Sequence, residues 1–108
     1  MYQDEMVLCG ASAYTQKYYL NEAFEGLPEG IKEELKIMCV LYTEDVGGVL
    51  TLVFDPDGNL QLQTDSEEMD LFYDEIGSVL KIKQLQRTKG ELLEALEMYY
   101  KIFFLGEE

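Results

Sequence analysis

The clearest alternation of apolar and polar residues lies in the segment Gly47 to Thr64, where two strand-like runs flank Asp55-Pro56-Asp57-Gly58. The incoming run, 49 to 54, carries apolar residues on both faces, which is typical of a strand covered on one side and adjoining a neighbour or an interface on the other. The outgoing run is one-sided, with Leu60 and Leu62 facing away from its glutamines. Since proline presets φ and glycine supplies a left-handed residue, the segment predicts a β-hairpin with a type I turn and a G1 bulge.

A helical periodicity follows Pro28. Apolar residues at positions 31, 35, 38, 39 and 42 share one face of a helix. Proline suits the first turn of a helix, the nearby glutamates suit the positive end of its dipole, and Gly47 can end the element. The continuous apolar run Ile37 to Leu41 would also suit a buried strand, so helix and strand are both open for it.

Two more helices are predicted in the C-terminal part. The first begins near Glu67, after a cap at Thr64, Asp65 or Ser66. Its apolar residues cluster on one side of the helix: Met69, Phe72, Tyr73, Ile76, Val79 and Leu80. The second begins at the capping box Thr88-x-x-Glu91 and carries a broad apolar stripe from Leu92 to Phe104. The link Gln86 to Lys89 is short, so the two form either an antiparallel pair or one long kinked helix.

Two N-terminal segments, Met6 to Cys9 and Lys17 to Leu20, are candidates for further strands beside the hairpin, the second at an edge of the sheet. The 108 residues contain no internal repeat and no linker, so residues 1–108 are expected to form a single domain. The predicted fold class is α+β, with a small antiparallel sheet built on the central hairpin and packed against about three helices.

The charge and the missing histidine restrict the kinds of catalysis and the classes of partner that the chain can support. There are 22 acidic and 8 basic side chains, no histidine, and a net charge of -14. The missing imidazole removes the commonest general base and metal ligand at neutral pH, and the excess of carboxylate disfavours partners rich in phosphate. We therefore expect no cofactor, no nucleic-acid partner and no catalytic residue.

The two cysteines, Cys9 and Cys39, form no C-x-x-C pair and have no histidine to complete a zinc site. Buried reduced thiols are the favoured interpretation, and a disulfide between them is the alternative. The stretch Met1 to Met6 is acidic where a signal peptide needs positive charge, and no apolar run approaches the ~20 residues that span a bilayer. These features predict a cytoplasmic protein without a membrane partner.

Carboxylates are the main candidates for chemistry. The densest acidic block runs from Asp65 to Glu75, and Asp70 and Asp74 stand one turn apart on the predicted helix. Such a pair could hold Mg²⁺ or Ca²⁺, or act as an acid and a base, whereas the simpler interpretation is a solvated face near a helix N-terminus. The turn at Asp55 opens like a calcium-binding EF-hand, but Leu60 and Ser66 stand where that loop needs glycine and glutamate. Ordinary turn chemistry is therefore expected there.

Half of the positive charge lies in one short segment, at Lys81, Lys83, Arg87 and Lys89. These residues are expected to pair with acidic faces of the same chain or of a second copy. A phosphate site is the alternative, which the net negative charge and the absence of a glycine-rich phosphate loop disfavour.

The adjacent tyrosines Tyr18-Tyr19 and Tyr99-Tyr100 are candidate interaction residues. Adjacent residues on a strand or a helix diverge, so one member of each pair should approach the surface. Tyrosine suits protein interfaces because a large apolar ring carries a polar tip. The alternative is that each hydroxyl simply reaches solvent at the margin of the core.

Together these features predict a non-catalytic protein-interaction module that contacts itself, as a possible homodimer, or another protein. An immunity-like or adaptor role would be one instance. Two alternatives stay open. One is a divalent-metal-dependent enzyme that uses the clustered carboxylates, and the other is an acidic mimic of nucleic acid.

Three segments resemble small acidic proteins of anaerobic Gram-positive bacteria that are grouped as a family of unknown function. The residues concerned are KYYLN at Lys17 to Asn21, LYTEDVGGVLTLVFD at Leu41 to Asp55, and YDEIGSVLKIKQLQ at Tyr73 to Gln86. The resemblance covers nearly the whole chain and implies no activity, cofactor or catalytic residue.

Overall fold

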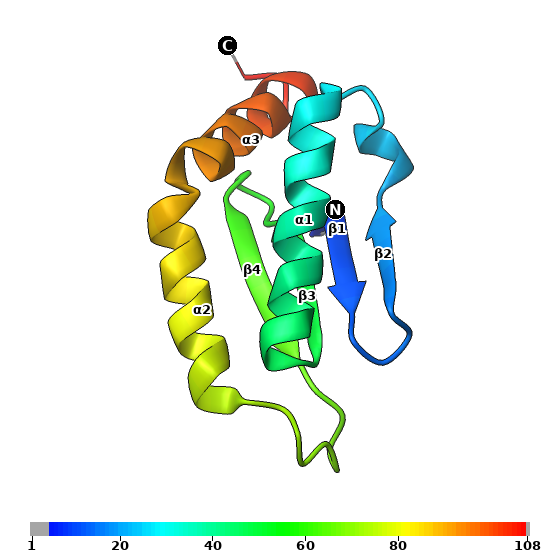
Figure 1. Ribbon diagram of the computed structural model, residues 1–108. Coiled ribbons are helices and arrows are strands. Elements are labelled where there is room, and N and C mark those ends of the chain that lie inside the picture. Colours follow the sequence, from blue (N-terminus) through cyan, green and yellow to red (C-terminus); the bar gives the residue numbers. More distant parts are fainter. Residues whose placement is uncertain (1–4, 108) are drawn as a thin grey trace.

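The computed structural model describes residues 5–107 and combines a four-stranded antiparallel sheet, in the order β2-β1-β3-β4, with three α-helices (Figure 1). In chain order the elements are β1 Met6–Ser12, β2 Lys17–Leu20, the short 3-10 helix Glu22–Phe24, α1 Glu29–Val46, β3 Val49–Phe54, β4 Leu60–Asp65, α2 Glu75–Thr88 and α3 Gly90–Phe103. This arrangement confirms the predicted α+β fold class. The acidic N-terminal stretch that argued against a signal peptide lies largely outside the described residues.

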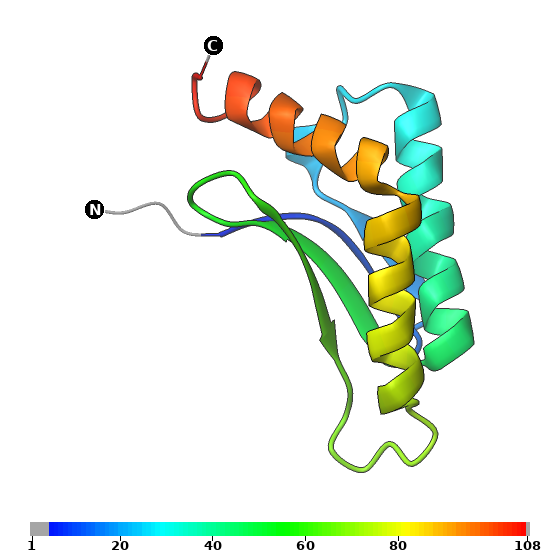
Figure 2. The ribbon, with the colours of Figure 1, turned by 90° about the vertical axis from the view of Figure 1, so that its left-hand side faces the viewer.

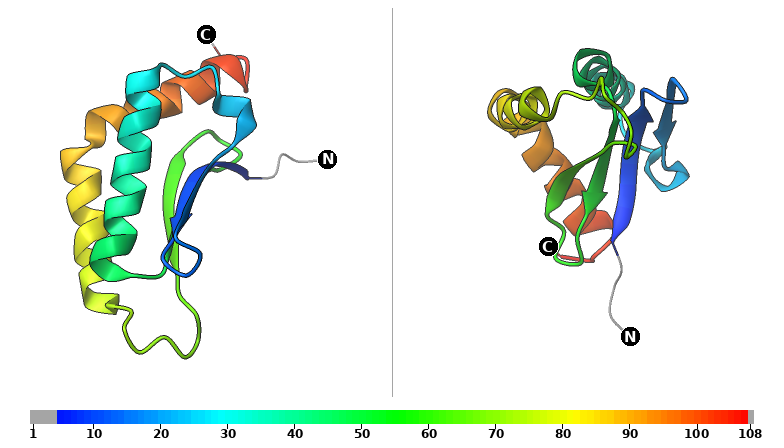
Figure 3. Two further views of the ribbon diagram at one scale, coloured as in Figure 1. Left: turned by 45° about the vertical axis from the view of Figure 1, so that its right-hand side comes forward. Right: turned by 90° about the horizontal axis from the view of Figure 1, so that it is seen from below.

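The helices cover one face of the sheet. Helices α1 and α2 run side by side along it, and α3 turns away from α2 to cross one end of the sheet (Figures 2 and 3). Helix α1 packs against β1 and β3, whereas α2 packs mainly against α1 and α3. Helix α2 therefore lies at the side of the molecule, with only part of its surface covered.

The hairpin of β3 and β4 is confirmed, including its turn. The Asp55 N–H donates to the Asn59 carbonyl at 2.9 Å, the Gly58 N–H donates to the Asp55 carbonyl at 2.9 Å, and Gly58 has a φ of 92°. The Asp55 carboxylate accepts hydrogen bonds from the backbone N–H groups of Asn59 and Asp57, which hold its pKa below the ordinary value. The acidic turn is thus used to close the hairpin, as expected.

Both predicted N-terminal segments are strands, and β1 runs three residues beyond the predicted Met6 to Cys9. Strand β1 pairs with β3 and becomes a central strand, and β2 pairs with β1 to form one edge of the sheet. The apolar run Ile37 to Leu41 is helical, within α1. Ile37 and Leu41 are half exposed whereas Met38 and Cys39 are buried, which is the pattern of a helix with one covered face.

The core lies between the sheet and the helices. Four aromatic rings stack there, and those of Phe54 and Tyr100 are nearly parallel with centroids 4.1 Å apart. Both cysteines are buried, as expected, with the Sγ atoms of Cys9 and Cys39 3.9 Å apart as free thiols. A hydrogen bond with Cys9 and burial raise the pKa of the Cys39 thiol.

The predicted start of the second helix, near Glu67, is wrong. Helix α2 begins at Glu75, and its cap is Asp74, whose Oδ1 accepts the Gly77 N–H at 2.8 Å. The residues before it form turns because the Tyr14 hydroxyl accepts the Glu67 N–H at 2.9 Å and donates to Asp70 at 2.6 Å. These bonds bind the segment to the loop between β1 and β2 instead of to a helix.

The predicted capping box at Thr88 is also wrong. Thr88 is the last residue of α2, and its hydroxyl donates to the Gln84 carbonyl at 2.8 Å. Helix α3 follows after Lys89 alone, and the Leu93 N–H donates to the Lys89 carbonyl. Of the two arrangements considered, the long kinked helix is therefore the one observed, bent at Lys89 and Gly90 (Figure 2).

Candidate interaction surface

The four candidate tyrosines lie on two different elements. On β2, Tyr19 is 56 % exposed, and Tyr18 is half buried with a hydroxyl that has no hydrogen-bond partner within residues 5–107. On α3, Tyr99 packs against Phe103, whereas Tyr100 is 1 % exposed in the aromatic core. The divergence of adjacent side chains is as expected. A contact role for these tyrosines stays a prediction, and for Tyr100 it would require the ring to leave the core.

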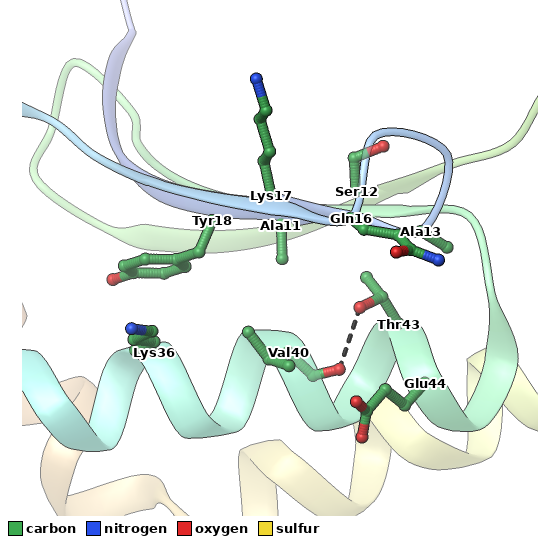
Figure 4. A pocket seen from close by; sticks show the side chains of 10 residues that line it. All are labelled: Ala11, Ser12, Ala13, Gln16, Lys17, Tyr18, Lys36, Val40, Thr43 and Glu44. Carbon is green, nitrogen blue, oxygen red and sulfur yellow. Dashed lines mark hydrogen bonds between the residues drawn. The ribbon is translucent and has the colours of Figure 1, made fainter.

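A pocket lies between the β1–β2 hairpin and α1, with a volume of about 660 Å³ (Figure 4). Ala11 and Tyr18 point from the sheet toward α1, while Lys17 points away. The Thr43 hydroxyl donates to the Val40 carbonyl at 2.9 Å, and burial raises the pKa of Tyr18. Both hydroxyl groups are therefore poorly suited to proton transfer at neutral pH.

The two candidate metal ligands have structural roles. Asp70 accepts the Tyr14 hydroxyl and the Phe72 N–H, and the first of these bonds is the main reason why its pKa is lowered. Asp74 caps α2, so the two carboxylates do not share a helical face as predicted. Within residues 5–107 no group of three or more acidic or cysteine side chains is placed to hold a metal ion.

Exposed apolar side chains gather instead on α2 and on the turns before it. We name it the outer α2 surface. Its six side chains are exposed by 55 to 95 %: Met69, Leu71, Phe72, Ile76, Val79 and Leu80. The sequence predicted five of these residues on the apolar side of a helix. That side faces solvent because α2 packs inward through Ser78 and Leu85, on the opposite side of the helix.

Buried hydrogen bonds hold the outer α2 surface in place. The Tyr42 hydroxyl lies 2.6 Å from Ser78 Oγ, and Tyr73 donates to the same oxygen at 2.8 Å. Burial raises the pKa of Tyr42 to about 12. The Tyr73 ring packs over Gly48, where a Cβ atom would lie 2.6 Å from the ring. Tyr73 is thus anchored inward while its neighbour Phe72 points out, 95 % exposed.

The basic segment divides into two parts. Lys81 and Lys89 pair within the chain, with Asp45 and Glu34 respectively, each at 3.1 Å. Lys83 and Arg87 are exposed and form no ion pair within the part of the chain that the structure describes. They continue the helical stripe of Ile76 and Leu80, at spacings of three and four residues. The outward side of α2 is therefore apolar in its first half and basic in its second.

A family model described as "Family of unknown function (DUF6145)" matches residues 5–108. The chain belongs to this family. No curated protein and no solved structure matches it. Among residues 5–107 of this DUF6145 protein, no helix has both the length and the apolar character needed to cross a membrane. Membership in a family of unknown function is thus confirmed, and the expected bacterial source and cytoplasmic location stay predictions.

Proposed function

We propose that this DUF6145 protein is a non-catalytic protein-interaction module that binds its partner through the outer α2 surface. The exposure of six large apolar side chains on one anchored segment supports this proposal. The largest apolar patch of a typical monomer covers about 300 to 600 Å² and often serves a function, so a set of this kind indicates an interaction site. Burying this area against a partner is favourable, because apolar surface in contact with water costs free energy.

The net charge of -14 supports a protein partner over the two other common classes. Nucleic acids and anionic lipid headgroups are polyanions, and the field of this chain repels them at ordinary salt.

A non-catalytic role is supported by the use of polar groups in folding. The hydroxyls of Tyr14, Tyr42, Thr43 and Ser78, and the carboxylates of the two candidate metal ligands, all hold other groups of the chain. The alternative of a divalent-metal enzyme has a direct test. If Asp70 binds Mg²⁺ or Ca²⁺, the metal must raise the melting temperature relative to EDTA, whereas we expect no shift.

Site-specific photo-crosslinking tests the proposal. A benzophenone amino acid replaces Phe72 or Leu80 on the outer α2 surface, or Met98 on α3 as the control, in cells that naturally make the protein. Met98 is 64 % exposed and Leu80 is 62 % exposed, so the two are matched in access to solvent. We expect one discrete crosslinked protein from positions 72 and 80 and none from position 98. No product from 72 and 80, or the same products from all three, would contradict the proposal.

A further inference from the structure

We propose that the occupant of the outer α2 surface is a second copy of this chain, with the two α2 helices packed antiparallel about a twofold axis. This inference rests on the function proposed above and specifies the partner. It follows from the order of charged and apolar groups along α2 and the turns before it.

The N-terminal end of this surface is acidic. Glu67 and Glu68 precede Met69, and Glu75 begins α2. Its other end is basic, with Lys83 and Arg87 directed outward and free of ion pairs within residues 5–107. The surface therefore carries both signs of charge, at opposite ends of one apolar patch.

An antiparallel twofold arrangement satisfies both ends at once. The apolar middle of each copy, around Ile76 and Leu80, meets the same residues of the other copy, as an isologous interface requires. Each acidic end then faces the basic end of the partner, and the dipoles of the two helices are opposed. In a parallel arrangement like charges would face each other at both ends, which is unfavourable.

The dimensions of the surface suit such a pair. Helix α2 has 14 residues, so it is ~21 Å long at about 1.5 Å per residue. Ile76, Leu80, Lys83 and Arg87 form a ridge at spacings of three and four residues, the spacing by which helices interdigitate. A standard interface buries roughly 800 Å² on each partner, so the charged ends are expected to be buried together with the apolar side chains.

A second copy explains the charge pattern better than an unrelated basic protein does. A basic partner would complement Glu67 and Glu68 but would oppose Lys83 and Arg87 on the same surface. A second copy supplies a basic end for the glutamates and an acidic end for Lys83 and Arg87. The repulsion between two chains of charge -14 is long-ranged, and at physiological salt it is screened beyond ~8 Å.

Sedimentation of charge-reversed variants tests the pairing. One variant reverses the basic end, Lys83→Glu with Arg87→Glu, and the other reverses the acidic end, Glu67→Lys with Glu68→Lys. All four side chains are exposed, so the fold should be retained, and circular dichroism checks it. Across a dilution series at physiological salt, the wild type should dimerise, and each variant alone should associate at least tenfold more weakly. An equimolar mixture of the two should recover the wild-type affinity, since both ends are then complementary.

Two single substitutions locate the interface. Leu80→Glu should abolish the dimer, and Met98→Glu, the matched control on α3, should leave it unchanged. A wild type that stays monomeric, or a dimer insensitive to Leu80→Glu, would overturn the inference. A mixture no tighter than its components, or one tighter than the wild type, would overturn the antiparallel arrangement. If the photo-crosslinker at position 72 captures a different protein, the proposed function holds and the homodimer does not. If it captures no protein, both the proposed function and the homodimer are contradicted.

Discussion

Replacing Ser78 with alanine should weaken the fold through one buried hydroxyl. Ser78 is 4 % exposed on the inward side of α2, and its Oγ is bonded to both Tyr42 and Tyr73. In the Ser78→Ala variant the Tyr42 hydroxyl stays buried and loses this partner. Tyr73 is only partly buried, so its hydroxyl has better access to water.

Two contributions set the size of this destabilisation. A buried hydroxyl left without a partner costs about 1 to 3 kcal/mol. The exchange of serine for alanine within a helix returns about 0.5 kcal/mol through helix propensity. The net loss of unfolding free energy is therefore about 0.5 to 2.5 kcal/mol, with a central value of about 1.5 kcal/mol. Adding Tyr42→Phe removes the unpaired group, so the double variant should be no less stable than Ser78→Ala alone.

Urea denaturation followed by circular dichroism measures this loss. The Leu80→Glu background prevents association from contributing to the apparent stability. With a slope of about 1.5 kcal/mol per molar urea, the midpoint should fall by about 1 M, with an unchanged slope. An unchanged midpoint for Ser78→Ala, or a double variant that loses as much again as the single one, would show that the Tyr42 hydroxyl does not depend on Ser78.

Three further outcomes follow from the described contacts. Gly48→Ala should destabilise the fold, because Gly48 has a φ of 69° and the new Cβ would meet the Tyr73 ring. Gly30→Ala, at a helical position with open space around it, should raise the free energy of unfolding by up to about 1 kcal/mol in urea titrations. Stability should fall as pH rises from 10 toward 12, because unfolded Tyr42 ionises first, and Tyr42→Phe should flatten this fall in urea midpoints measured at each pH. Cys39 should react with a disulfide reagent only on unfolding, as thiol titration with and without urea will show.

Local chemistry was enough to predict the parts of the fold that close within a few residues. The turn of the hairpin was predictable because Asp55, Pro56 and Gly58 each satisfy a specific backbone requirement. Helix α1 was predictable because eighteen residues carry one consistent apolar face between a proline and a glycine. The apolar run Ile37 to Leu41 follows the same period, since Met38 and Cys39 are buried on the covered side of the helix and Ile37 and Leu41 are half exposed on the other.

The start of α2 was not predictable from its own segment. Several caps between Thr64 and Asp74 are equally suitable in isolation. The choice is made by contacts that are distant in sequence, from Tyr14 to Asp70 and from Tyr42 to Ser78. The same limit applies to Thr88, which has a cap-like neighbour three residues later but continues the hydrogen bonds of α2. Tertiary contacts override local signals at both positions.

The candidate surface was missed for a different reason. A stripe of apolar residues at helical spacing indicates an amphipathic helix, and the usual inference is that the stripe faces the core. On α2 the inward side carries Ser78, and the outward side carries Ile76 and Leu80, which is the reverse of an ordinary surface helix. A polar serine is tolerated at this buried position because its hydroxyl is hydrogen-bonded to the hydroxyls of Tyr42 and Tyr73. The helical period holds for Ile76, Val79 and Leu80 within α2, whereas Met69 and Phe72 of the predicted stripe lie in the turns before it.

This inversion separates the requirements of folding from those of binding. The inward contacts of α2 fix its position through Ser78, Leu85 and the ion pair of Lys81 with Asp45. Ile76 and Leu80 contribute little to this packing, since each leaves more than half of its side chain in water. Folding of one chain therefore does not account for these residues, whereas burial against a second surface does. Substitutions there should change association and leave the unfolding of the single chain nearly unchanged.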